Sequence, residues 1–245
     1  MKYKNKFKTK LGMTLVETLI TLTIIAVVSV IVLGTVVSDT KRNETTVRLK
    51  KSYSVLQQAL EMAVAKNGDP GSWEVMSGSS GAGSLRFFDK YLKEQMILAK
   101  DCKIANTEEC DFIFKELNAN ERSLDNTWTR FYLNDGTFIA MKLSSDNNNK
   151  LLMFYVDTNG KKRLNVVARN IFLFEYWIEN KDKPSYVGKL LPYGHQYSRD
   201  DLLLPLNDNS CHHTATGNYC AAVIMKDNWE MTLGYPWAHA RYAIK

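Results

Sequence analysis

Four cysteines are the residues whose spacing most directly suggests chemistry. Cys102 and Cys110 have seven residues between them, and Cys211 and Cys220 have eight. Four cysteines allow three disulfide connectivities, and the sequence does not choose among them. We favour pairing within each local pair, because each bond would close a short polar loop. Free thiols remain an alternative. So does a metal site that uses the two histidines after Cys211, although no CxxC unit is present.

A second group of polar residues resembles part of a calcium site. Asp157, Asn159 and Gly160 have the spacing of half a calcium loop, but the later bidentate glutamate is missing. An Asn-Gly hairpin turn explains these residues without a metal, so calcium binding is left open. The chain contains no Gly-x-Ser-x-Gly, His-Glu-x-x-His or glycine-rich phosphate loop. The sequence therefore predicts neither an enzyme nor a bound cofactor or metal.

Glu17 is a carboxylate at the start of a long uncharged run. From Thr18 to Ser38 there are 21 residues without formal charge, which as a helix would extend about 31 Å. That length predicts a membrane-spanning helix. The preceding lysines predict a cytoplasmic N-terminal flank and an external chain after about residue 39. A secretory signal fits poorly, because Val36-Val37-Ser38 does not resemble its cleavage site, whereas an ordinary signal anchor remains an alternative.

The formal charge of +6 is concentrated at the N-terminus. Five lysines lie in residues 1–12, namely Lys2, Lys4, Lys6, Lys8 and Lys10, and no acidic residue precedes Glu17. The remaining residues carry 27 Lys plus Arg against 26 Asp plus Glu, a formal charge of +1. A nearly neutral body argues against broad electrostatic binding of DNA. A nucleic-acid partner is therefore not expected, except through a role in DNA uptake.

The stretch from Lys10 to Glu17, Lys-Leu-Gly-Met-Thr-Leu-Val-Glu, resembles the type IV prepilin signal. The resemblance implies cleavage after Gly12 and N-methylation of Met13 by a prepilin peptidase. It also implies assembly with other pilin subunits through the apolar helix. Leu11 stands where family members often have a basic residue, and Gly34 stands where many have proline.

Glu17 would acquire a partner only after that cleavage. The new α-amino group of Met13 lies four residues away, on the same side of a helix. The pair could form within one subunit or between neighbouring subunits, as the resemblance implies. The alternative is that Glu17 acts only as a favourable charge at a helix N-terminus.

The rest of the chain predicts a long helix followed by mixed structure. No proline occurs between Met13 and Asp69, and the apolar spacing from Leu49 to Ala63 indicates one buried helix face. Gly68 and Pro70 would end a helix of about 54 residues. A short helix at 85–99 and antiparallel strands at 128–133, 137–143, 151–156, 163–168, 171–177 and 219–225 are expected to follow, with turns at 134–136 and 157–160.

These features predict an α+β, pilin-like fold in which a long N-terminal helix, membrane-spanning in its first half, packs on an antiparallel sheet. The expected parts are a leader at 1–12, a transmembrane assembly helix at 13–38, an amphipathic stalk at 39–67 and a globular domain at 70–245. The expected protein is a subunit of a type IV pilus or type II secretion-like filament, single-pass in the cytoplasmic membrane with its globular domain outside. The alternative is a permanently anchored binding module or adhesin.

Overall fold

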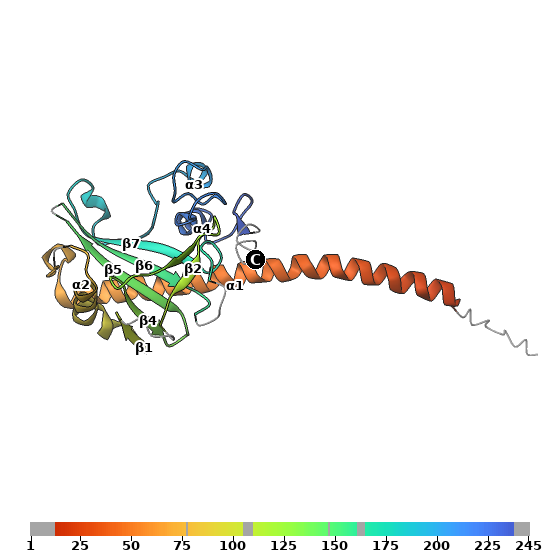
Figure 1. Cartoon of the computed structure of the whole chain (residues 1–245), viewed down its shortest axis with the longest axis horizontal. Coiled ribbons are helices and arrows are strands. Elements are labelled where there is room, and N and C mark those ends of the chain that lie inside the picture. Colours follow the sequence, from red (N-terminus) through yellow and green to blue (C-terminus); the bar gives the residue numbers. More distant parts are fainter. Residues whose placement is uncertain (1–12, 77, 105–109, 147, 161–164, 238–245) are drawn as a thin grey trace, which may run out of the picture. The chain divides into compact units, whose positions relative to one another are not determined.

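A computed structural model describes residues 13–76, 78–104, 110–146, 148–160 and 165–237 of the chain (Figure 1). The predicted leader and its Gly12 lie outside these residues. The chain divides into two units, residues 1–41 and 42–245. Helix α1 (Leu15–Asn67) contributes residues to both. This division lies close to the boundary that the sequence placed between residues 38 and 39.

Helix α1 contains 53 residues and ends where the sequence predicts. Gly68 has a φ of +81°, which glycine adopts without strain, and its N–H donates to the carbonyl of Val64 at 2.8 Å. Asp69 and Pro70 then begin the 3₁₀ turn η1 (Pro70–Ser72). The predicted glycine cap is confirmed.

The predicted membrane-spanning half of α1 is not found. Within the described residues, no helix combines the length and the apolar character needed to cross a membrane. The fold class is corrected in this respect, and the predicted single-pass location in the cytoplasmic membrane loses its basis.

The second unit is built on a six-stranded antiparallel sheet. Its strands are β1 (Leu98–Lys103), β4 (Thr129–Leu133), β5 (Phe138–Ser145), β6 (Asn149–Asp157), β7 (Ile171–Asn180) and β8 (Leu190–Pro192), and they lie side by side in that order. A separate hairpin pairs β2 (Ile113–Lys115) with β3 (Glu121–Ser123). The turn between β4 and β5 is the predicted Asn134-Asp135-Gly136 turn, with Gly136 at a φ of +87°.

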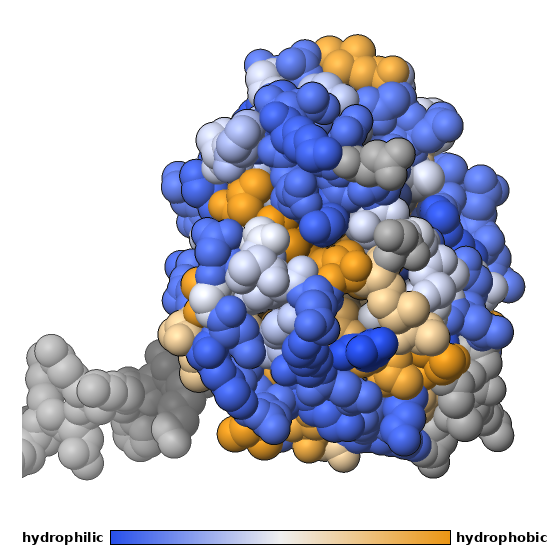
Figure 2. Space-filling model, turned by 90° about the vertical axis from the view of Figure 1, so that its left-hand side faces the viewer, coloured by the Kyte–Doolittle hydropathy of each residue, from blue (hydrophilic) through white to orange (hydrophobic). Residues whose placement is uncertain are grey.

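Side chains alternate along each strand, so every strand contributes residues to both faces of the sheet. Both faces are buried, each in its own hydrophobic core. One face packs with Leu49, Leu56, Leu60 and Ala63 of α1, as the sequence predicts for the stalk. Figure 1 shows the strands beside this part of α1. The other face packs with Phe112, Phe114 and Trp128 from the loops and β2. The surface at the end of this unit that carries helix α2 (Gly81–Phe87) is mostly hydrophilic, with small separate hydrophobic patches (Figure 2).

The short helix expected at 85–99 begins earlier and ends earlier. The structure has α2 (Gly81–Phe87), a π-helical turn η2 (Phe88–Leu92) and a 3₁₀ turn η3 (Lys93–Gln95). The Ser80 side chain accepts from the N–H of Gly83 and starts the helix. A Cβ at Gly81 would lie 1.9 Å from the carbonyl oxygen of Asn126, so only glycine fits there.

Two predicted strands are wrong. The strand predicted at 219–225 is instead a helix, α4 (Cys220–Lys226). The prediction failed because a short apolar run that is buried on all sides has no periodicity that distinguishes a helix from a strand. The partner of β6 is β7 rather than 163–168. In the segment 163–168, Val166 and Val167 make only isolated bridges. Residues 163 and 164 lie outside the described residues. The remaining elements are η4 (Pro184–Tyr186) and α3 (Arg199–Leu203).

Candidate assembly surface

The start of α1 is held by a capping contact between two of the predicted signal residues. The N–H of Glu17 donates to Oγ1 of Thr14 at 3.2 Å. Thr14 and Glu17 have the Ser/Thr-x-x-Glu spacing of a capping box. The exposed carboxylate of Glu17 has no hydrogen bond or ion pair to any residue that the structure describes. Glu17 therefore occupies the first turn, where a negative charge is favourable, with its side chain available to another group.

The first unit carries an apolar surface that the rest of that unit does not cover. Each of these side chains is between 49% and 77% exposed. They are Met13, Leu15, Val16, Leu19, Ile20, Leu22, Ile24, Ile25, Val27, Val28, Val32, Val36 and Val37. Their positions cover every side of a helix with 3.6 residues per turn. Exposed apolar surface of this extent marks an interaction site.

Threonine hydroxyls do not make this surface polar. Oγ1 of Thr18 donates to the carbonyl of Leu15 at 2.9 Å, and Oγ1 of Thr21 donates to the carbonyl of Glu17 at 2.9 Å. Thr23 makes the same kind of bond to Leu19 at 2.8 Å. Side chains that bond back to their own helix need no outside partner. The helix can therefore be covered by apolar groups without leaving these hydroxyls unpaired.

The four cysteines form the two local disulfides that the sequence favours. Cys102 pairs with Cys110, and Cys211 pairs with Cys220. All four residues are buried, in the cores on opposite faces of the sheet. They brace the second unit, whereas Met13 and Glu17 belong to the first. His212 and His213 are in ring contact with each other, and no group of three His, Cys, Asp or Glu in the described residues is arranged to hold a metal.

Asp157 holds a turn together. Its Oδ1 accepts from the backbone N–H of Asn159 at 3.0 Å and from Nδ2 of Asn170 at 3.0 Å. Burial raises the pKa of its carboxyl group to about 7, against the effect of these hydrogen bonds. The bonds account for the Asp-x-Asn-Gly pattern as turn chemistry.

A buried acid–base pair was missed by the sequence reasoning. Glu175 of β7 lies on the sheet face opposite α1, and its Oε1 is 2.9 Å from Nδ1 of His195. Tyr186 packs edge-on against the histidine ring at 4.5 Å. Burial raises the pKa of Glu175 to about 7. Burial and then the nearby Lys183 lower the pKa of His195. The one available signal was a glutamate inside the apolar run from Ile171 to Ile178.

The architecture defines a class only in general terms: a helix with an uncovered apolar surface, and a disulfide-braced unit built on an antiparallel sheet. Residues 35–238 match a family that is described as a family of unknown function (DUF6613), and the chain belongs to this family. No curated protein and no solved structure matches the chain. The family match includes residues 42–238 of the second unit and assigns no function to them.

Proposed function

We propose that this chain is a subunit of a pilin-like filament and assembles through the apolar surface at residues 13–37. The observation that carries the proposal is the set of exposed aliphatic side chains on the first part of α1. A fully buried side chain of this kind contributes roughly 1.5–3 kcal/mol. Covering the remaining exposed half of thirteen such side chains would then supply on the order of 10 kcal/mol, enough to offset much of the cost of association.

Processing at the start of the helix completes the proposal. The prepilin resemblance from Lys10 to Glu17 supports cleavage after Gly12 and methylation of Met13. The new amino group and the carboxylate of Glu17 carry opposite charges. Pairing them, within one subunit or between neighbours, would prevent an isolated charge from being buried in an apolar assembly. The exposed position of Glu17 is compatible with either pairing.

Assembly of the full chain tests this proposal. We expect Ile20→Asp to abolish sedimentable filaments, because burying an unpaired carboxylate costs far more than the apolar contact gains. Ile97→Asp is the matched control, since Ile97 is 74% exposed but lies in the second unit. The same preparation gives the subunit mass, which we expect to equal residues 13–245 plus one methyl group.

Two results would contradict the proposal. One is a wild-type chain that stays monomeric after processing. The other is assembly that tolerates Ile20→Asp as well as it tolerates Ile97→Asp. An uncut N-terminus in assembled material would remove the processing step and leave the apolar contact standing.

A further inference from the structure

Charge is segregated within the second unit, although residues 13–245 carry a formal charge of only +1. Residues 199–234 have a formal charge of −3, with two basic residues against five acidic ones: Asp200, Asp201, Asp208, Asp227 and Glu230. Residues 42–51 of α1 have a formal charge of +3, with one acidic residue against four basic ones: Arg42, Arg48, Lys50 and Lys51. Such a separation favours association of unlike faces.

Three exposed leucines lie within the acidic region and are called here the leucine patch: Leu204, Leu206 and Leu233. Their side chains are 50%, 58% and 96% exposed. A leucine that is 96% exposed adds nothing to the packing of its own subunit. An apolar centre with a charged rim is the usual anatomy of a protein–protein interface.

Arg199 fixes the two parts of the leucine patch relative to each other. Its guanidinium binds Asp227 through two nitrogens, at 2.6 and 2.9 Å, and donates to the carbonyl of Leu233 at 3.0 Å. Arg199 also begins α3, which spans only about 7.5 Å before Leu204 follows. The N–H of Cys211 donates to the carbonyl of Leu202 at 2.7 Å and restrains the next loop. The patch is thus presented by a braced framework, which lowers the entropic cost of docking.

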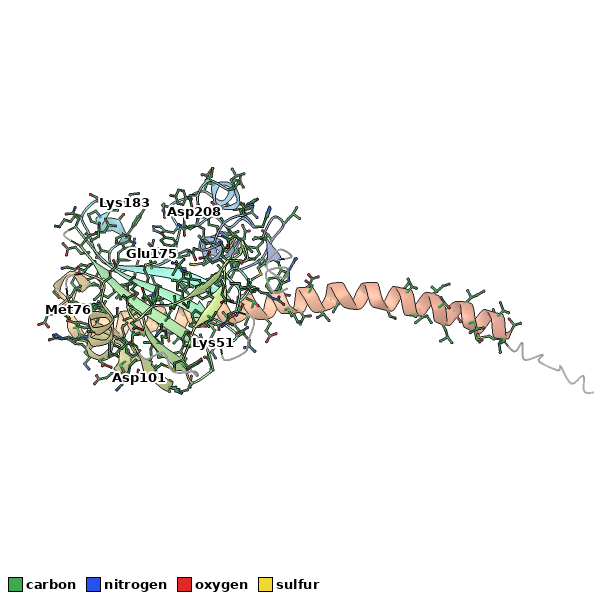
Figure 3. All side chains as sticks on the ribbon, in the orientation of Figure 1. Lys51, Met76, Asp101, Glu175, Lys183 and Asp208 are labelled. Atoms are coloured by element: carbon green, nitrogen blue, oxygen red, sulfur yellow. A yellow bond between two sulfur atoms is a disulfide. The ribbon has the colours of Figure 1, made fainter. Side chains whose placement is uncertain are left out.

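The basic region presents a matching surface on α1. Val47 is 68% exposed, and Lys50 and Lys51 follow it by three and four residues, on the same side of the helix. Lys51 also pairs with Asp135 at 2.8 Å, and counting this carboxylate gives the basic face a formal charge of +2. Figure 3 shows Lys51 and Asp208 at separate places on the second unit. One copy therefore cannot bring its own two faces together.

We infer that the leucine patch of one copy docks on the basic face around Val47 of a second copy. The contact is heterologous, since it joins two different surfaces, and repetition of it adds copies in one direction. It rests on the proposed function for its setting in a filament, but it uses none of the residues of the apolar surface. Charge provides orientation, and Leu233 against Val47 provides the apolar centre.

The full chain carrying Ile20→Asp isolates this contact, because the apolar helix is then blocked. Sedimentation velocity is expected to show self-association at about 50 mM salt and its loss at about 500 mM, where charges are screened within a few ångströms. Lys50→Glu and the double variant Asp200→Lys/Asp208→Lys should each weaken association about tenfold. Lys189→Glu, an exposed charge reversal outside both faces, is the matched control.

Mixing the two charge variants gives the sharpest result. Each variant keeps one intact face, so their equal mixture is expected to form heterodimers that associate about tenfold more tightly than either variant does with itself. The inference is overturned if the mixture associates no better than either variant, or if salt and charge reversal have no effect. The proposed function fails separately, when Ile20→Asp does not prevent filament assembly.

Discussion

Glu17 and Glu175 are two carboxylates in opposite surroundings. Glu17 is exposed in the first turn of α1, whereas Glu175 is buried beside His195. A charge next to an uncharged run is visible in the sequence, so Glu17 could be singled out. The Glu175–His195 contact could not be predicted, because the nineteen residues between them must first fold over β7.

Glu175→Gln should alter the pH dependence of stability. The pKa of Glu175 is raised to about 7 in the folded protein, from an ordinary value of 4.5. The folded state therefore binds this proton more tightly than the unfolded state. The wild type loses stability as pH rises through this range. Glutamine has no such loss, so we expect the variant to gain on the order of 2 kcal/mol relative to wild type between pH 5 and pH 8.

Denaturant unfolding at the two pH values measures that difference. The contribution of Asp157, whose pKa is also raised, is present in both proteins and largely cancels. His195 contacts Glu175 and its lowered pKa acts in the opposite direction, so the measured difference reports the Glu175–His195 pair rather than Glu175 alone. A difference in the free energy of unfolding that stays constant with pH would contradict the account.

Elements with strong local signals were predictable from the sequence. The end of α1 at Asn67 follows from Gly68, and the β4–β5 hairpin follows from its Asn-Asp-Gly turn. Elements decided by tertiary packing were not predictable. The run from Cys220 to Ile224 is enclosed by the core, so its residues are apolar on every side and their spacing does not indicate a helix. Helix α3 and the loop after it were also not predicted, because the five residues of α3 are too few to show a helical periodicity.

The Cys211–Cys220 bond ties α4 to the loop that follows α3. Closing a loop of this length is expected to stabilise the fold by about 2.5 kcal/mol on the chain-entropy account. Cys211→Ala with Cys220→Ala should therefore lower the free energy of unfolding by at least this amount, because the replaced sulfurs are also buried. Denaturant unfolding measures it. The same double change at Cys102 and Cys110 is the comparison, and no loss at either pair would contradict the bracing role.

At the scale of the molecule, the two units bury their apolar residues very differently. The second unit covers both faces of its sheet, while the first leaves its aliphatic side chains exposed. That contrast is what the filament proposal explains. Composition and charge pattern indicated the apolar helix in advance, and the predicted membrane span was wrong for the residues described. The charge of residues 199–234 can be counted in the sequence, whereas the separation of the acidic and basic faces depends on where the fold places these residues.

Protection of the helix in the assembled state tests the central claim most directly. A single cysteine at Val28, introduced as Val28→Cys, reports access to a thiol reagent, since the four native cysteines are paired. Ile97→Cys, in the second unit, is the control. We expect the thiol at position 28 to react at least tenfold more slowly in assembled than in dispersed protein, while the thiol at position 97 stays reactive. Equal reaction of position 28 in both states would contradict assembly through this surface.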